Sequence, residues 1–181
     1  MTLFESAPYR NLILTGSMGV GKTSIGRLVA RQLSADFYDL ETEILTREGQ
    51  SADQIREMFG EARLKALEAV AVRDLTLHRH SVLVIHGPAV LDDINRERLL
   101  ESGTLLCLTC ALNEILRRLH VARGVWFHNP YNRAIMLSRL KRERRVTQLD
   151  LPQLDTTRLT TEAAAASVIE FWLSQAGLTS A

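Results

Sequence analysis

The sequence has few cysteines, no long apolar run and no marked excess of charge of either sign. Its two cysteines, Cys107 and Cys110, form one C-x-x-C pair, and no histidine pair at zinc-finger spacing completes a tetrahedral zinc site. Because Cys107 lies inside the apolar run of residues 105–108, we expect it in the core. No apolar run reaches the length of a transmembrane helix, so the sequence predicts no membrane span.

The charges nearly cancel, with a formal net charge of +1, which gives no case for a nucleic acid or a membrane surface as partner. The first residues lack the charged and apolar segments of a secretion signal. The length of 181 residues suits one domain with a sizeable core, and we expect residues 1–181 to form it. Together with the sparse cysteines, these features predict a cytoplasmic protein, a monomer or weak dimer.

The sequence does contain a glycine-rich phosphate-binding pattern. Residues 16–23 read G-S-M-G-V-G-K-T and match G-x-x-x-x-G-K-[ST] at every fixed position. The preceding apolar residues 11–15 predict a buried parallel strand. The following residues 24–33 predict a helix with one apolar face, formed by Ile25, Leu28, Val29 and Leu33. A strand, a glycine-rich turn and a helix are the context that this pattern requires.

The residue types of this loop suit a nucleotide. Glycines allow a sharp turn that brings backbone N–H groups close to phosphate oxygens, and the helix dipole adds to the attraction. Lys22 supplies a mobile charge for the outer phosphates, and Thr23 offers a hydroxyl to Mg²⁺. The predicted nucleotide-binding residues of the loop are Gly16, Gly19, Val20, Gly21, Lys22, Thr23 and Ser24. The alternative, a bare turn that binds nothing, leaves the Gly-Lys-Thr ending unexplained.

Strand and helix patterns alternate along the rest of the chain. Further strands are expected at residues 37–40, 82–85, 104–108 and 151–155, the last at a sheet edge because it contains proline. Helices are expected at residues 41–49, 92–100, 113–120, 133–146 and 162–175, the last of which stops at Gly177. Another helix is expected to start at residue 51 and to be interrupted at Gly60, after which a longer helix covers residues 61–77. Residues 121–132 are expected to be irregular. This order predicts an α/β fold, a parallel sheet with helices on both faces.

Between residues 12 and 119 the chain resembles the shikimate kinases, within the nucleoside-monophosphate-kinase-like group. The resemblance rests on the loop and on the segments F-Y-D-L-E-T-E-I, G-E-A-R-L-K-A-L-E, V-I-H-G-P-A-V-L and N-E-I-L-R-R-L. It implies a three-layer fold around a five-stranded parallel sheet, with ATP and Mg²⁺ as cofactors. It also implies transfer of the γ-phosphate to a hydroxyl of shikimate or a related small carboxylated compound.

The resemblance assigns two acids after the second strand. The family has a D-x-D pair there, the first acid near the metal and the second on substrate hydroxyls; here Asp39 keeps the first position and Glu41 replaces the second. The third strand ends without an acid, so Asp39 and Thr23 are the predicted metal residues. Glu41 is the predicted catalytic acid beside Lys22, but its extra methylene displaces the acceptor by roughly 1 Å, which can cost about 100-fold in rate. Simpler roles are a helix N-cap for Asp39 and a dipole-stabilising first-turn acid for Glu41.

The rest of the acceptor site departs further from the family. Lys65 stands where the family has an arginine that clamps the substrate carboxylate, and it lacks the two-point fork. The family's G-G-G turn reads His86-Gly87-Pro88, so one backbone donor is lost and a ring is added. An exposed lysine and a space-filling histidine are the simpler alternatives. Lys65, His86, Gly87, Glu41 and Arg144 are the candidate substrate-binding residues.

Beyond residue 119 the resemblance weakens. Arg118 matches the family residue that packs on adenine, and Arg144 is what remains of a motif whose arginine meets the substrate carboxylate. The family's lid arginine has no counterpart in the candidate lid, residues 121–132: Val125 or Trp126 falls near its place, and Arg123 is the alternative. Residues 139–145 contain five basic side chains and one acid, Glu143. The acid and the small net charge indicate a solvated helix face with one inward residue rather than a nucleic-acid site.

Three functions remain open. The first is a kinase of the shikimate kinase type, and the second is a degenerate, non-catalytic ATP- or ADP-binding protein of the same fold. The third is a kinase for a nucleotide or another distant acceptor. A GTPase is not favoured because the sequence has no N-K-x-D guanine motif.

Overall fold

The computed structural model describes residues 10–175, without the side chains of residues 123, 126 and 127. The expected helix stop at Gly177 and the first nine residues therefore lie outside the described part, as does the side chain of Arg123. Within the described residues, no helix has both the length and the apolar character needed to cross a membrane.

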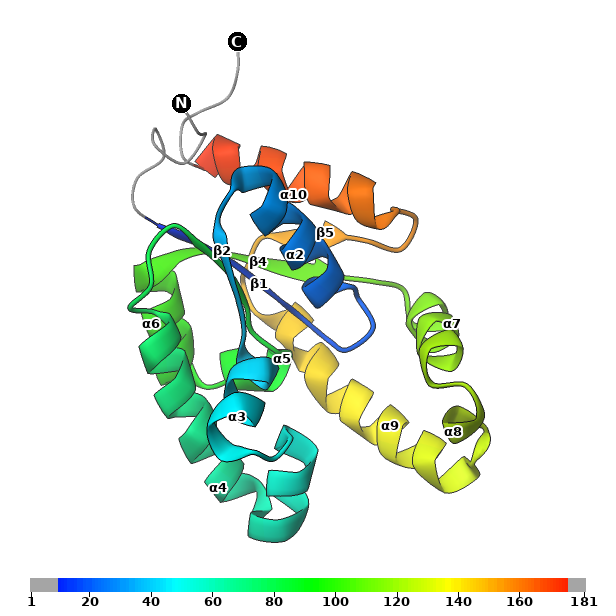
Figure 1. The fold of residues 1–181 in the computed structure, drawn as a ribbon. Helices are drawn as coiled ribbons and strands as arrows, with labels where there is room; N and C mark the ends of the chain where they lie inside the picture. Colours follow the sequence, from blue (N-terminus) through cyan, green and yellow to red (C-terminus); the bar gives the residue numbers. More distant parts are fainter. Residues whose placement is uncertain (1–9, 176–181) are drawn as a thin grey trace.

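Five parallel strands form the centre of the fold (Figure 1). They are β1 (Asn11–Gly16), β2 (Asp36–Asp39), β3 (Ser81–Val84), β4 (Gly103–Thr109) and β5 (Gln153–Asp155). The sheet order is β2-β3-β1-β4-β5, and all four pairings are parallel. The predicted parallel sheet is confirmed, and its proline-preceded strand β5 lies at an edge.

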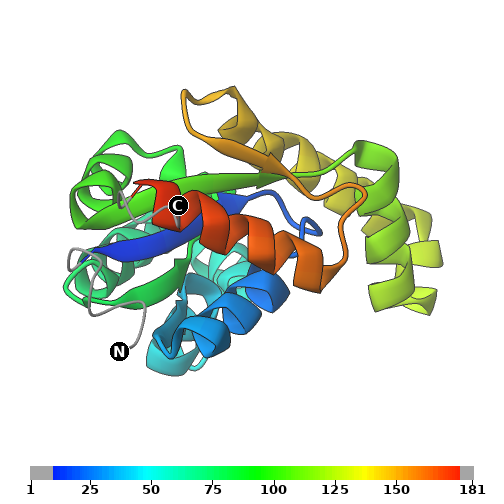
Figure 2. The same cartoon turned by 90° about the horizontal axis from the view of Figure 1, so that it is seen from above.

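Helices cover both faces of the sheet, which confirms the three-layer architecture. One face carries α2 (Lys22–Leu33) and α10 (Thr161–Gln175), which pack together (Figures 1 and 2). The other face carries α3 (Leu40–Glu48), α4 (Ala52–Leu75), α5 (Gly87–Val90) and α6 (Asp93–Ser102). Beyond the phosphate loop lie α7 (Leu112–Arg123), α8 (Val125–His128) and α9 (Pro130–Glu143), followed by the 3-10 turn η1 (Arg144–Gln148).

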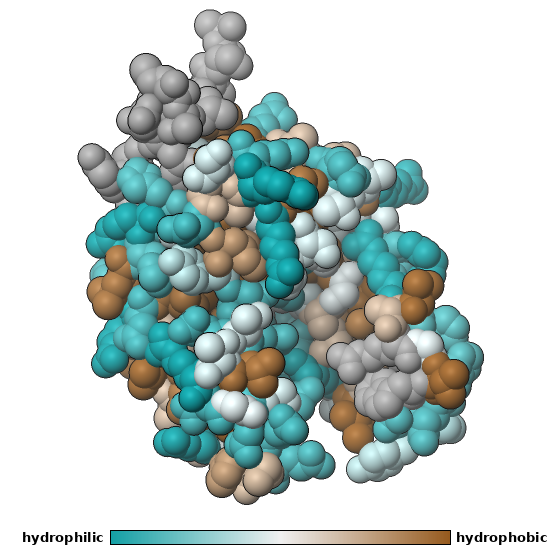
Figure 3. All heavy atoms as spheres, viewed as in Figure 1, coloured by the Kyte–Doolittle hydropathy of each residue, from teal (hydrophilic) through white to brown (hydrophobic). Residues whose placement is uncertain are grey.

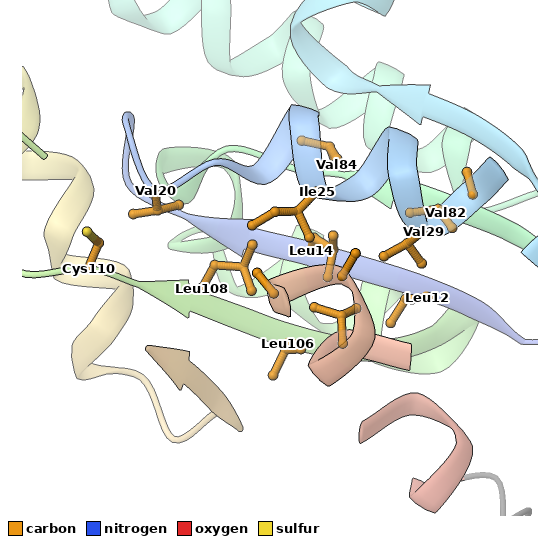
Figure 4. Packing of buried hydrophobic residues seen from close by; sticks show 14 of the residues in the cluster. Leu12, Leu14, Val20, Ile25, Val29, Val82, Val84, Leu106, Leu108 and Cys110 are labelled. Atoms are coloured by element: carbon orange, nitrogen blue, oxygen red, sulfur yellow. The ribbon is translucent and has the colours of Figure 1, made fainter. Parts of the chain in front are cut away.

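The strands bury both of their faces because successive side chains point in opposite directions. Leu12 and Leu14 of β1 pack against α2 and α10, whereas Ile13 between them packs against the helices on the other face. Figure 4 shows the first cluster, in which Val29 of α2 lies over β1. Such continuous apolar strands are typical of parallel sheets, and this is why the short apolar run at residues 11–15 predicted a buried parallel strand.

The segment 121–132 differs from the expectation of an irregular stretch. Helix α7 continues to residue 123, α8 occupies Val125–His128, and α9 begins at Pro130. Gly124, with φ of 48°, separates α7 from α8, and the Asn129 side chain accepts from the Tyr131 N–H at the start of α9. Glycine and proline therefore mark helix boundaries here, because proline fits the first turn of a helix, where its missing N–H costs nothing. The short helix α5 was also not anticipated.

Gly103 at the start of β4 gives a test of the sheet packing. A Cβ at this position would lie 2.2 Å from the carbonyl oxygen of Asn11, so β1 and β4 would have to separate. Gly103→Ala should therefore lower the free energy of unfolding by about 1–3 kcal/mol, as overpacked cores do. Urea denaturation followed by circular dichroism measures this, and Glu101→Ala on the exposed side of α6 is the control. Equal midpoints for the two variants would contradict the packing argument.

Candidate active site

The phosphate loop joins β1 to α2 and depends on three glycines. Gly16, Gly19 and Gly21 have φ of 139°, 77° and 100°, a region that side chains rarely adopt. A Cβ on Gly16 would lie 2.3 Å from the Leu108 carbonyl oxygen, so the loop can pass close to β4 only with glycine there. The chain thus has the cradle of backbone amides at a helix N-terminus that phosphate oxygens require.

Lys22, at the start of α2, turns back onto the loop. Its Nζ donates to the Ser17 carbonyl oxygen at 2.9 Å. Burial lowers the pKa of Lys22, while the nearby carboxylates of Glu143, Glu41 and Asp39 act in the opposite direction. A bound phosphate would add further negative charge, so the ammonium form of Lys22 is the form that a nucleotide selects.

Thr23 and Asp39 come together at the mouth of the loop. The Thr23 hydroxyl donates to Asp39 Oδ2 at 2.8 Å, and Asp39 Oδ1 accepts from the Glu41 N–H at 3.0 Å. Asp39 therefore caps the N-terminus of α3 and also contacts the Thr23 hydroxyl, which is predicted to bind the metal. A hydroxyl and a carboxylate are hard oxygen donors and fit Mg²⁺ that also binds phosphates. Among the described residues, no group of three or more His, Cys, Asp or Glu side chains is arranged to hold a metal ion.

A cavity of about 380 Å³ opens above the loop. The surface is hollowed between α3 and α4 on one side and α7 to α9 on the other (Figure 3). We call it the phosphate cavity; its lining includes Gly19, Gly21, Lys22, Thr23, Ser24, Asp39, Glu41, His86, Arg118 and Glu143. The structure thus brings most of the predicted nucleotide residues to one cavity, together with Glu41 and His86.

Arg118 lies on the side of the phosphate cavity away from Glu41. Its guanidinium donates to Glu114 at 2.8 Å and to the Thr156 carbonyl oxygen at 2.9 Å. Hydrogen bonds from Arg117 and Arg118 lower the pKa of Glu114 to about 2. Arg118 also lines an adjoining cavity of about 590 Å³ beside the 156–161 segment, a place consistent with its predicted role beside a base.

Arg139 of α9 dominates the opposite side, and sequence reasoning did not single it out. It donates to both Asp53 oxygens at 2.7 Å, to Glu143 Oε1 at 2.8 Å and to Glu41 Oε1 at 3.4 Å. It lines a cavity of about 320 Å³ that shares Met18 and Glu41 with the phosphate cavity. We call this the acceptor cavity, because the sequence predicts that Glu41 faces the acceptor. The sequence predicted Arg144 as the substrate residue of this basic segment, whereas the structure brings Arg139 of the same segment to the cavity.

Glu143 is the second residue that sequence reasoning missed. Its side chain is only 3% exposed, and its Oε2 accepts from the Met18 N–H of the phosphate loop at 2.7 Å. The only signal in the sequence was that Glu143 follows Arg139 by four residues, a spacing that predicts an ion pair on one helix face. A carboxylate therefore occupies a loop amide beside the cavity that the phosphates would enter.

His86 and Glu68 form a buried pair. The His86 Nε2 and Glu68 Oε1 lie 2.9 Å apart, and His86 is 8% exposed. His86 lines the phosphate cavity, whereas Glu68 lines a separate cavity of about 540 Å³, which we call the outer cavity. Lys65 lines the outer cavity too, so the structure does not bring it beside Glu41.

Two other candidate substrate residues lie away from the phosphate cavity. Gly87 starts α5 and packs under the end of α9, where a Cβ would lie 2.9 Å from the Glu143 carbonyl oxygen. Arg144 begins η1 and does not line the phosphate cavity, the outer cavity or the two cavities that contain Arg118 and Arg139. Cys107 and Cys110 are buried, and burial raises the pKa of the Cys107 thiol to about 11, as a core residue requires.

The parallel sheet, the glycine-rich loop and the paired Thr23 and Asp39 define a P-loop kinase fold. The shikimate kinase family model matches residues 18–172, and the chain belongs to the shikimate kinase family.

Individual relatives of this chain are also shikimate kinases. Shikimate kinase from Geobacter sulfurreducens is 43% identical over 110 residues, which are 61% of this chain and 61% of the relative. The enzyme from Methylococcus capsulatus is 40% identical over 111 residues, 61% of this chain and 62% of the relative. The chain thus matches about three fifths of the length of these relatives. The solved shikimate kinase from Acinetobacter baumannii, in complex with shikimate, has a TM-score of 0.80 at 25% identity and covers 94% of this chain and 97% of its own.

The phosphate loop makes nucleotide binding measurable without turnover. ADP with Mg²⁺ should raise the melting temperature, since a ligand that binds only the folded state stabilises it, by about 2.7 kcal/mol at 100 times Kd. Lys22→Ala should remove most of this rise, and Lys65→Ala, in the outer cavity, should keep it. An equal rise in wild type and Lys22→Ala would refute the loop assignment.

Glu143 should oppose nucleotide binding. Glu143→Gln keeps an oxygen to accept from Met18 but removes a negative charge beside Lys22. The ADP affinity should therefore increase several-fold, a change of roughly 1 kcal/mol in the free energy of binding. Isothermal titration calorimetry checks this, with the exposed Glu97→Gln as the control. Weaker ADP binding by Glu143→Gln would show that the carboxylate supports the loop instead.

Proposed function

We propose that this protein is an ATP- and Mg²⁺-dependent small-molecule kinase that transfers the γ-phosphate to a hydroxyl of its acceptor. Shikimate and related ring compounds are the first acceptors to test, given the family. The observation that carries the proposal is the single cavity in which the phosphate loop meets Asp39 at the end of β2 and Glu41 at the start of α3. Phosphoryl transfer depends mostly on positioning and on electrostatic stabilisation, which such an arrangement provides.

Each residue of this cavity then has a role. The loop amides and Lys22 hold the phosphates, and Arg118 lies beside the base. Thr23 and Asp39 would hold Mg²⁺, which when bound neutralises phosphate charge. Glu41, whose carboxylate lines both the phosphate and the acceptor cavity, orients the acceptor hydroxyl. Arg139, in turn, holds Glu41 in place through the 3.4 Å contact.

We further propose that residues 1–181 act as one domain in the cytoplasm, as a monomer or weak dimer, without nucleic acid. The near-neutral charge and the two free, buried cysteines support this setting. Residues 121–132, which contain α8, are proposed as the lid. Ala122, at the start of this segment, lines the phosphate cavity, which supports this assignment.

The non-catalytic alternative makes a different prediction for turnover. A kinase consumes ATP faster when its acceptor is added and yields one phosphorylated acceptor per ADP. A degenerate binding protein shows nucleotide binding with no acceptor-dependent ADP. Coupled ADP release with shikimate, and mass spectrometry of the product, separate the two. Nucleotide binding without any phosphorylated product would favour the non-catalytic protein.

Asp39 and Glu41 should have separable effects. Asp39→Asn removes a charge that a hard cation prefers, so it should weaken the Mg²⁺ dependence of nucleotide binding. Glu41→Gln should leave ADP affinity within a few-fold but remove most phosphoryl transfer, because it alters the group that orients the acceptor. Titration of ADP at several Mg²⁺ concentrations and a turnover assay measure the two effects. Normal Mg²⁺ dependence in Asp39→Asn with full activity in Glu41→Gln would contradict both roles.

A further inference from the structure

The backbone N–H groups of the phosphate loop can hold phosphate oxygens only where their peptide planes face the phosphates. A trans peptide is planar, and its C=O and N–H groups point in opposite directions. In the Ser17–Met18 peptide the two groups accordingly have separate partners: the carbonyl oxygen accepts from Lys22 Nζ, and the N–H donates to Glu143. A group that binds a loop carbonyl therefore also directs the N–H of the next residue.

The Val20–Gly21 peptide, just before α2, has partners on its carbonyl side. The carbonyl oxygen accepts from the Thr156 hydroxyl at 3.0 Å and from Arg118 at 3.4 Å. The Gly21 N–H has no acceptor among the described residues. Thr156 lines the cavity of about 590 Å³ beside residues 156–161, which we call the base cavity, whereas Gly21 also lines the phosphate cavity. With the carbonyl turned to Thr156, the N–H is turned away from it, toward the phosphates.

The sheet register places Thr156 beside the loop. Strand β5 pairs with β4 up to Asp155, which lies opposite Thr109, so Thr156 is the first residue beyond the carboxyl edge. The Thr156 N–H donates to the Thr109 carbonyl oxygen at 2.8 Å. Next to it, the Thr157 hydroxyl oxygen accepts from the Ala111 N–H at 2.8 Å, at the start of α7. These bonds hold the segment in place without the Thr156 hydroxyl.

The Thr156 hydroxyl has one proton and two carbonyl oxygens at 3.0 Å, those of Val20 and Thr109. The Thr109 oxygen already accepts from the Thr156 N–H. The Val20 oxygen otherwise has only the longer contact from Arg118, and Val20 is 1% exposed. Because a buried carbonyl without a hydrogen bond is costly, the hydroxyl proton belongs to the Val20 oxygen.

We propose that Thr156 is a positioning residue whose hydroxyl holds the Val20–Gly21 peptide with its N–H toward the phosphates. Gly21, with φ of 100°, leaves this peptide free to turn, so the loop needs such an anchor. Without the hydroxyl, the Val20 carbonyl turns toward another donor and the Gly21 N–H leaves the direction that a phosphate oxygen requires. The proposal rests on the nucleotide binding of the proposed function, but not on phosphoryl transfer.

Thr156→Val removes the hydroxyl and keeps the shape of the side chain. It should weaken ADP binding about 3- to 10-fold, the range of one hydrogen bond, in calorimetry with Mg²⁺. Pyrophosphate, which has phosphates but no base, should lose the same factor when it competes with ADP. Thr156→Ser keeps the hydroxyl and should retain both affinities. Thr46→Val is the matched control, because it removes a hydroxyl that donates to a carbonyl oxygen on the exposed side of α3, and it should change neither affinity.

Thr156→Ala also lacks the hydroxyl and repeats the test if the valine variant does not fold, as judged by circular dichroism. A loss for ADP without a loss for pyrophosphate would place the effect at the base and overturn the proposal. A lower melting temperature with unchanged affinities, or an equal loss in Thr156→Ser, would overturn it as well. No ADP binding by the wild type would overturn it together with the proposed nucleotide binding. The expected losses in a protein that phosphorylates no acceptor would support it and count against kinase activity.

Discussion

The parallel pairing of β1 with β3 and β4 is the constraint on which the rest of this molecule depends. Because all strands run the same way, their carboxyl ends meet at one edge, and the loops that follow them share one space. The phosphate loop follows β1, Asp39 ends β2, and His86 follows β3. Gly16 allows the loop to pass within contact of β4, so the position of the loop is fixed by the sheet itself.

The two sides of the resulting cavity have different electrostatic character. On the nucleotide side, loop amides, Lys22 and the N-terminus of α2 present positive charge to phosphates. On the acceptor side, three carboxylates surround Arg139, and Glu143 occupies a loop amide.

The His86–Glu68 pair joins the linings of the phosphate cavity and the outer cavity. Both side chains are buried and bonded to each other, and a histidine in place of a backbone-only turn brings a ring into the wall of the phosphate cavity. The second ring nitrogen, Nδ1, has no partner among the described residues. Lys65, which the family resemblance placed on the substrate, lies in the outer cavity together with Glu68 of the same helix, α4.

Local sequence determined much of this protein. The phosphate loop, the Ser51–Gln54 capping box, the break at Gly60 and the C-cap at Gly49 were all predictable, since each depends on residues adjacent in the chain. The parallel sheet followed from alternating short apolar strands and helices. By contrast, the helical nature of residues 121–132 was missed, because glycine and proline there mark helix boundaries rather than a loop.

Tertiary structure alone decided the acceptor side. Asp53 lies on α4, whereas Arg139 and Glu143 share α9, and no spacing rule joins α4 to α9 or α9 to the amide of Met18. Equally, Lys65 and Arg144 have suitable charges, but helix packing determines which cavity a charge faces. Sequence patterns report periodicity and local backbone preference, whereas the meeting of distant charged groups depends on how the layers pack around the sheet.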